Sequence, residues 1–157
     1  MKPFLILAVL MAPVAMSQEK AEDRTIMVSS EDRDMAAAIR HAQETLDGFL
    51  AILTKPPKGA SGFKIMVKVE DAGEVEHFWV TPFMQTSGGF AGTIANAPEL
   101  VHSIKLGQTY RFSRSAISDW GYVLNGKQKG SFTVCVLFKQ MPKKEADVYR
   151  KDYGFEC

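Results

Sequence analysis

The sequence predicts an α+β fold, with one long N-terminal helix, an antiparallel meander sheet of five to six strands and a short C-terminal helix. A change of hydrophobic pattern along the chain predicts it. Between residues 35 and 53 the apolar residues recur at three- and four-residue steps, as on one side of a helix, whereas from residue 63 they alternate with polar residues, as in half-buried strands. The length of 157 residues, with 46% hydrophobic and 24% charged side chains, is typical of one ordinary globular domain.

The N-terminus has the order of a cleavable export signal. A lysine precedes an apolar run from Phe4 to Val14, and Ala15 and Ser17 are small residues at the positions that signal peptidase reads. Cleavage is expected after Ser17, which makes residues 1–17 a signal peptide. A membrane anchor is the alternative, but the apolar stretch from Phe4 to Met16 has only about thirteen residues, fewer than the roughly twenty that span a bilayer.

Cleavage would leave a flexible leader, residues 18–28, and a single domain at residues 29–157. The chain has 19 Lys and Arg against 18 Asp and Glu, and the signal peptide contains one lysine, so the mature domain is formally neutral with 18 of each. A neutral domain offers no basic footprint for nucleic acid. No membrane insertion is expected after signal cleavage. We therefore expect an exported protein whose partner is an unknown protein or small ligand in the cell envelope.

A long helix is expected after Ser29 or Ser30, because either serine can serve as its N-cap. Acidic residues follow in the first turn, where the helix dipole favours them. The helix should end before Pro56, since proline interrupts a helix. One apolar stripe should cover the rest of the domain, and it consists of Met35, Ile39, Ala42, Leu46, Phe49 and Leu53.

Strands are expected where apolar and polar residues alternate between turn residues. In the second strand, Phe78 and Val80 share one face while His77 and Trp79 share the other. An Asn-Gly pair at residues 125–126 favours a tight hairpin turn. The expected strands are residues 63–70, 75–81, 90–95, 109–113, 117–124 and 130–139.

The last expected strand, residues 130–139, leads to the C-terminal helix. Its core face would carry Phe132, Val134, Val136 and Phe138. Pro142 then opens a helix that Gly154 ends as a C-cap. Cys135 and Cys157 are the two cysteines of the chain, and such a pair predicts a disulfide in an oxidising compartment. A buried free Cys135 and a reactive C-terminal thiol are the alternatives.

One candidate site is catalytic. A hydrolase-type enzyme needs a histidine with a carboxylate in reach, and His77 with Asp119 is the candidate pair by residue type. The alternative is a structural histidine beside Trp79. Nucleophilic catalysis has little support, because no Gly-x-Ser-x-Gly motif occurs and Cys135 in mid-strand lacks the helix N-terminus that would activate a thiol.

The other candidate site is aromatic. Trp79, Trp120 and Tyr122 fall in expected strands, where they either belong to the core or, if exposed on one face, serve as the anchors of a binding surface. Both interpretations stay open. No metal site and no cofactor are expected, because His41 and His102 lack ligand-like spacing and neither HExxH nor CxxC occurs.

Several short motifs between Ala36 and Phe155 form a distinctive combination. They are Glu76-His77-Phe78-Trp79-Val80, Gly89-Phe90-x-Gly92, Asn96-x-Pro98, Lys105-x-Gly107-Gln108, Ile117-Ser118-Asp119-Trp120, Asn125-Gly126-Lys127 and Gly130-x-Phe132-Thr133-Val134. Together they resemble the YegJ-like family of bacterial domains of unknown function. The resemblance implies a bacterial, periplasmic protein, and it brings no established activity and no catalytic residues.

These observations favour a non-enzymatic binding or interaction module. An immunity-type inhibitor of an exported toxin is one version of it, by analogy with other small exported domains. A hydrolase-type enzyme using His77 and Asp119 is the first alternative. A structural envelope-stress protein without a dedicated ligand is the second.

Overall fold

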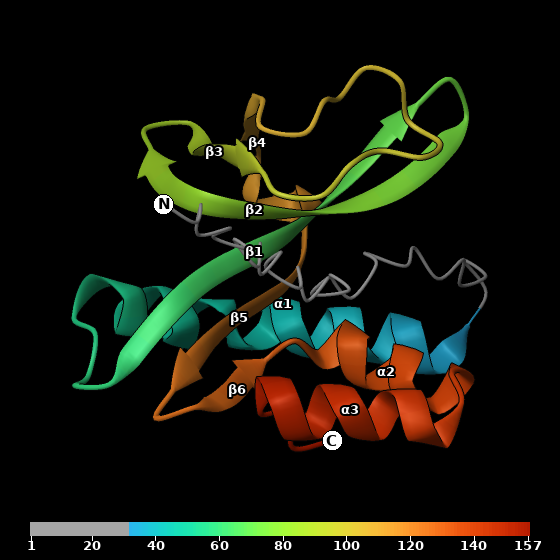
Figure 1. The fold of residues 1–157 in the computed structure, drawn as a ribbon. Helices are drawn as coiled ribbons and strands as arrows, with labels where there is room; N and C mark the ends of the chain where they lie inside the picture. The colour runs from blue at the N-terminus through green and yellow to red at the C-terminus, as the bar shows by residue number, and fades with distance from the viewer. Residues whose placement is uncertain (1–31) are drawn as a thin grey trace, which may run out of the picture.

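The computed structural model describes residues 32–157, so the predicted signal peptide, the leader and the two serines expected to cap the first helix lie outside the described residues. The elements are α1 (Arg33–Thr54), β1 (Ala60–Asp71), β2 (Glu74–Thr86), β3 (Gly89–Ile94), β4 (Thr109–Phe112), a 3-10 helix (Arg114–Ala116), β5 (Ile117–Leu124), β6 (Lys127–Gly130), α2 (Phe132–Gln140) and α3 (Lys143–Tyr153). The six strands form one antiparallel sheet in the order β4-β3-β2-β1-β5-β6, and the three α-helices gather below the long β1–β2 hairpin in the view of Figure 1. The predicted α+β class is confirmed.

The hairpin of β1 and β2 forms the middle of the sheet. Its two-residue turn, Ala72-Gly73, has φ angles of 51° and 88°, as a tight hairpin requires. β2 pairs with one edge of β1 and β5 with the other, so Ile65 lies opposite both Val80 and Trp120. This register places three core side chains next to one another on the same face of the sheet.

The helix α1 begins at Arg33, later than predicted, because Asp32 is its N-cap. The Asp32 carboxylate accepts a hydrogen bond from the Met35 backbone N–H at 2.9 Å. The predicted apolar stripe is confirmed in the middle of the helix, where three of its members are buried: Ala42, Leu46 and Phe49.

Aromatic contacts attach α1 to the sheet. The ring of Phe49 stacks on that of Trp120, with centroids 4.9 Å apart. The Trp120 indole N–H donates to the Ala42 carbonyl oxygen at 3.0 Å, which satisfies the polar atom of a buried tryptophan. The core around this contact includes the buried side chains Ile65, Val67, Val69, Phe78, Val80, Phe90, Ile94, Val101, Ile104, Phe112, Ile117 and Tyr122.

The strand predicted for residues 130–139 is wrong, because β6 ends at Gly130 and the chain then turns into α2. Gly130 and Ser131 have φ angles of 72° and 55°, and this left-handed backbone leads the chain out of the sheet. The apolar residues of this segment fit a buried helix as well as a strand, so the pattern alone could not distinguish the two. On α2 the buried residues are Thr133, Val136 and Phe138.

The predicted C-terminal helix is confirmed as α3, which follows Pro142 and ends at Gly154 with a left-handed φ of 74°. The structure contains the disulfide between Cys135 and Cys157, whose Cα atoms are 5.5 Å apart. Because residue 135 lies in α2, the disulfide joins a helix to the C-terminus, where a strand was expected.

The C-terminal segment, residues 154–157, lies along the outer edge of β6. The Gly154 carbonyl oxygen accepts a hydrogen bond from the Gln128 backbone N–H at 3.0 Å. The Glu156 carboxylate pairs with Lys127 at 2.8 Å and with Lys129 at 3.3 Å. The segment therefore covers part of a sheet edge that would otherwise be free.

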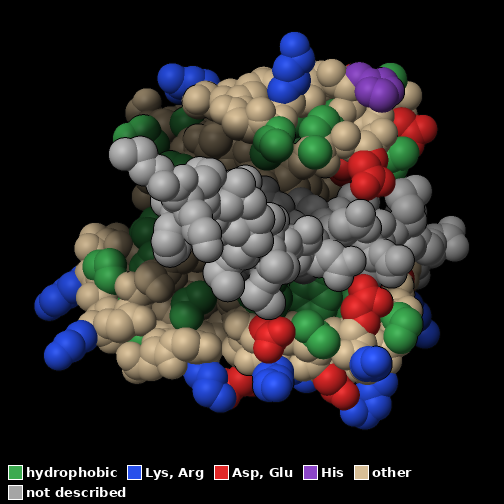
Figure 2. Space-filling model, viewed as in Figure 1, with side chains coloured by type: hydrophobic (Ala, Val, Ile, Leu, Met, Phe, Trp, Pro, Cys, Tyr) green, Lys and Arg blue, Asp and Glu red, His purple; other side chains and the backbone are tan. Residues whose placement is uncertain are grey.

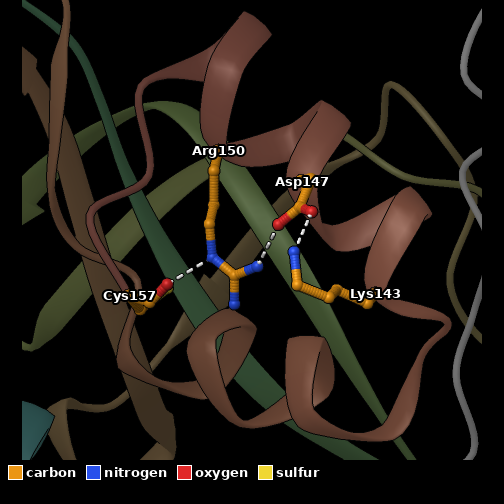
Figure 3. A network of polar contacts seen from close by, with 4 residues as sticks. All are labelled: Lys143, Asp147, Arg150 and Cys157. Atoms are coloured by element: carbon orange, nitrogen blue, oxygen red, sulfur yellow. Dashed lines mark hydrogen bonds and ion pairs between the residues drawn. The ribbon is translucent and has the colours of Figure 1, made fainter.

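Polar contacts on α3 also hold the C-terminus (Figure 3). Arg150 donates from Nε to the carbonyl oxygen of Cys157 and pairs with Asp147 at 2.9 Å. Asp147 in turn accepts from Lys143 at 2.5 Å, one helical turn earlier.

Within residues 32–157 no helix combines the length and the apolar character that crossing a membrane requires.

Candidate functional site

The face of the sheet turned away from α1 carries two of the predicted site residues, His77 and Trp79. In β1 the buried residues Ile65, Val67 and Val69 point toward the core, so the residues between them point the other way. In β2 the same alternation separates the buried Phe78 and Val80 from their neighbours. We call the resulting surface the outer face, and it consists of Lys64, Met66, Lys68, His77 and Trp79.

Lys64 and Trp79 form the centre of the outer face. The Lys64 Nζ lies 4.3 Å from the centroid of the Trp79 ring, within the range of a cation–π interaction. The Trp79 backbone N–H donates to the side-chain oxygen of Asn96 at 2.8 Å, which secures the strand beneath the ring. Both side chains are partly buried.

The charge of Lys64 is only partly compensated. Burial lowers the pKa of its ammonium group, and the nearby Asp119 opposes this shift. Across residues 32–157 no hydrogen bond or ion pair joins the Lys64 ammonium to an oxygen atom. Among the described residues, the contact with the Trp79 ring and the charge of Asp119 are therefore the favourable interactions of this ammonium group.

His77 bonds to a serine and not to the predicted carboxylate. Its Nδ1 lies 2.8 Å from the Ser118 Oγ, and burial followed by the charge of Lys68 lowers its pKa. Ser118 is 3% exposed and also donates to the Met66 carbonyl oxygen at 3.4 Å. The histidine thus cross-links β2 to β5 over the strand between them.

Asp119 holds the N-terminus of α2. Its carboxylate accepts from the backbone N–H groups of Trp120 at 2.8 Å, Phe132 at 3.3 Å and Thr133 at 2.8 Å, and from the Thr133 hydroxyl at 2.5 Å. The N-cap residue of α2, Ser131, makes no capping hydrogen bond with its side chain. Asp119 therefore acts as the capping group of this helix. Burial raises the pKa of Asp119, although these four hydrogen bonds act in the opposite direction.

The structure therefore does not join the predicted catalytic pair. His77 and Asp119 each have other hydrogen-bond partners among the described residues, and none of those bonds connects the two side chains. No local pattern in the sequence indicated that Asp119 would cap α2, because this helix begins thirteen residues later in the chain.

Two of the three predicted aromatic anchors are not on the surface. Trp120 and Tyr122 are 8% and 6% exposed and lie on the face that α1 covers. The interpretation of these two residues as surface anchors is wrong, because the register that pairs Trp120 with Ile65 directs both rings into the core. Trp79 remains on the outer face.

Glu76 is a buried charged residue to which the sequence analysis assigned no role. It is 5% exposed, and its carboxylate accepts from the backbone N–H groups of Glu99, Leu100 and Val101 at 3.0–3.2 Å. It organises the loop of residues 95–108 against the core. A charged residue on the core face of a strand, two positions before Phe78, was the signal that could have identified it.

Two surface cavities lie away from the outer face. One of about 540 Å³ lies between α1 and the 3-10 helix, lined by Gln43, Leu46, Ser113, Arg114 and Ser115. The other, of about 400 Å³, lies between the start of β3 and the end of β4. Within residues 32–157 no three His, Cys, Asp or Glu side chains are arranged to hold a metal ion.

The fold and the outer face define a small α+β domain in which two buried carboxylates organise the backbone and a lysine–tryptophan pair lies on the sheet. The chain belongs to the family described as "Uncharacterized protein conserved in bacteria (DUF2314)", whose model matches residues 32–157. The predicted resemblance to YegJ-like domains is confirmed by a relative in Escherichia coli (strain K12), "Uncharacterized protein YegJ". The two are 31% identical over 150 residues, which are 96% of this chain and 97% of that protein.

A shorter match is to the "Putative ankyrin repeat protein NMB1133/NMB1171" of Neisseria meningitidis serogroup B (strain ATCC BAA-335 / MC58). It is 28% identical over 97 residues, which are 58% of this chain and 38% of that longer protein. No solved structure matches the chain. The comparisons thus establish the family and show no activity for it.

Proposed function

We propose that the protein is an exported, periplasmic binding module that engages a partner or ligand through the outer face of its sheet. The Lys64–Trp79 pair carries the proposal. A partly buried ammonium group lies over an indole ring on the two longest strands, where the backbone is held on both sides. Tryptophan is among the residues that most often contribute strongly to binding at interfaces.

The disulfide supports export. Disulfides form and persist in oxidising compartments such as the bacterial periplasm, and the structure pairs both cysteines of the chain. The predicted signal at residues 1–17 supports export independently, from the order of its charged, apolar and small residues.

The polar side chains favour binding over catalysis. Asp119 is engaged by α2, and Ser118 is buried beneath His77, so neither is free to meet a substrate. The hydrolase alternative based on His77 and Asp119 therefore has the weaker support. If the protein is instead a structural envelope-stress protein without a ligand, substitution of Lys64 or Trp79 should leave its interactions unchanged.

An immunity-type inhibitor is a narrower form of the proposal. In that form the outer face would cover an exported toxin, by analogy with other small exported domains. A gene for a toxin or a secretion component beside the gene for this protein would support it.

Export is tested by the intact mass of the protein recovered from the periplasmic fraction. We expect a chain that begins at Gln18 and is lighter by two hydrogen atoms than the same chain after reduction. A chain that keeps Met1 and remains in the cytoplasmic fraction would contradict the proposal.

Binding is tested by affinity capture from periplasmic extract on immobilised protein. We expect the wild type and an Asp152→Ala control on the surface of α3 to retain the same component, and Trp79→Ala and Lys64→Met to lose it. Urea unfolding of each variant separates lost binding from lost folding. Equal retention by all four proteins would count against the outer face.

A further inference from the structure

We propose that Lys64 and Trp79 form a carboxylate-binding site for an acidic segment of a partner protein. This inference rests on the proposed function and names the chemistry of the partner. It follows from the charge of Lys64, which has no ion pair among the described residues, and from the contacts that already engage the neighbouring carboxylates. The side chains of the outer face then indicate the kind of partner.

Lys64 is a partly buried cation on the outer face. Its Nζ is 4.3 Å from the Trp79 ring centroid, and the ring, unlike a carboxylate, leaves its three hydrogen-bond donors without acceptors. Within the described residues it makes no ion pair, whereas the other lysine of the outer face, Lys68, pairs with Glu70 at 3.5 Å. A carboxylate placed against Lys64 would supply the missing acceptors.

The carboxylates around the outer face are already engaged. Asp119 accepts four hydrogen bonds, three of them from Phe132 and Thr133 at the start of α2. Glu70 pairs with Lys68. Pairing Asp119 directly with Lys64 would break the hydrogen bonds that hold the start of α2, and pairing Glu70 with it would break the exposed ion pair with Lys68. A carboxylate from another molecule would complement the charge of Lys64 without either change.

The side chains of the outer face favour a protein partner. The partly buried Trp79 is of a residue type that is enriched at protein interfaces. It shares this face with Lys64 and the exposed Lys68, whose charges complement acidic side chains. We therefore assign the carboxylate to acidic side chains of a protein segment.

The test is a titration of the purified, oxidised protein followed by NMR. A hexaglutamate peptide with blocked termini is the probe, and sodium acetate is the comparison for a free carboxylate. We expect the Trp79 indole signal to shift to saturation with the peptide, about tenfold weaker binding for Lys64→Met, and unchanged binding for the matched control Lys151→Met on α3. Acetate should not saturate the signal at the same carboxylate concentration.

Each other outcome overturns the inference. Equal effects of Lys64→Met and Lys151→Met would mean that the peptide responds to overall charge. Saturation by acetate at the same carboxylate concentration would mean a site for small anions. Binding by the wild type that is equally strong in high salt would contradict a charge-based contact.

The test is separable from that of the proposed function. If periplasmic capture depends on Trp79 and Lys64 while the hexaglutamate peptide does not bind, the binding module stands and its partner is not recognised through carboxylates. If neither occurs, the proposed function fails together with this inference.

Discussion

Three ionisable side chains of the sheet, Lys64, His77 and Asp119, differ in how their burial is compensated. Asp119 is enclosed and receives hydrogen bonds from a helix N-terminus, while His77 shares one hydrogen bond with the buried Ser118. Lys64 has an aromatic ring and no oxygen partner among residues 32–157. The burial of Asp119 and His77 is therefore compensated within the fold, whereas Lys64 is the residue that we propose for recognition.

Replacing Asp119 should destabilise the protein. Asp119→Ala leaves the Phe132 and Thr133 backbone N–H groups without their acceptor, and we expect a loss of about 2–4 kcal/mol in the free energy of unfolding. Urea denaturation measures it, with the exposed Asp152→Ala as the control. A loss below about 0.5 kcal/mol for Asp119→Ala would show that water replaces the carboxylate at the start of α2.

The buried position of His77, which shares a hydrogen bond with Ser118, predicts that the stability of the protein depends on pH. The folded state lowers the pKa of His77, so it binds the proton less tightly than the unfolded state does. The stability that His77 contributes in its neutral form is therefore present above its ordinary pKa and is lost as the pH falls through the range below that value. Between about pH 7.5 and pH 5.5 the wild type should lose more stability than His77→Gln. Parallel pH profiles for the two proteins would contradict this assignment.

At the scale of elements, the left-handed link between β6 and α2 decides where the chain leaves the sheet. Gly130 has a φ of 72°, and a Cβ atom there would overlap the backbone and the ring of Trp120. Gly73, in the hairpin turn, has a φ of 88° with open space around it. The two glycines thus share the backbone requirement and differ in packing.

Gly130→Ala should therefore destabilise the protein more than Gly73→Ala. Backbone strain costs each variant about 1 kcal/mol, and the overlap with Trp120 adds about 2 kcal/mol or more at Gly130. Thermal or urea unfolding of the two variants measures the difference. Equal losses would mean that the link shifts easily and that the start of α2 is not set by this contact.

The disulfide should stabilise the C-terminal elements. It closes a loop with a sequence separation of 22 residues, for which the chain-entropy model gives about 3 kcal/mol. A dithiol reductant should lower the unfolding midpoint of the wild type and leave that of Cys135→Ala/Cys157→Ala unchanged. A wild-type midpoint that reductant does not move would show that the contacts of Gly154 and Glu156 suffice.

The sequence predicted the elements whose pattern is local. The stripe on α1, the alternation in β1 and β2, and the proline and glycine that bound α3 are each visible within a few residues. α2 was missed because its apolar residues suit two conformations and its capping group, Asp119, lies on another strand. The placement of His77 and Trp79 on one face follows from alternation. The burial of Trp120 depends on which face α1 covers, which no local pattern encodes.

At the scale of the whole molecule, the sheet has one face that carries the core and an opposite face that carries the Lys64–Trp79 pair. α1 covers the first with an aromatic cluster around Phe49 and Trp120, and the outer face lies opposite. Acidic and basic side chains alternate over the helices in the lower part of Figure 2. Among the described residues, the ion pairs of the helices include that of Lys139 in α2 with Asp34 in α1. The lysine–tryptophan pair differs from these contacts, because an aromatic ring and not a carboxylate faces the ammonium group.

In-cell photo-crosslinking tests most directly whether a partner binds at the outer face, as we propose. A photo-reactive amino acid is placed at Lys68 on the outer face or at Asp152 on α3, each in the full-length chain. We expect a discrete crosslinked product from position 68 that Lys64→Met suppresses, and no such product from position 152. The absence of a product at position 68, or the same products from both positions, would contradict the claim.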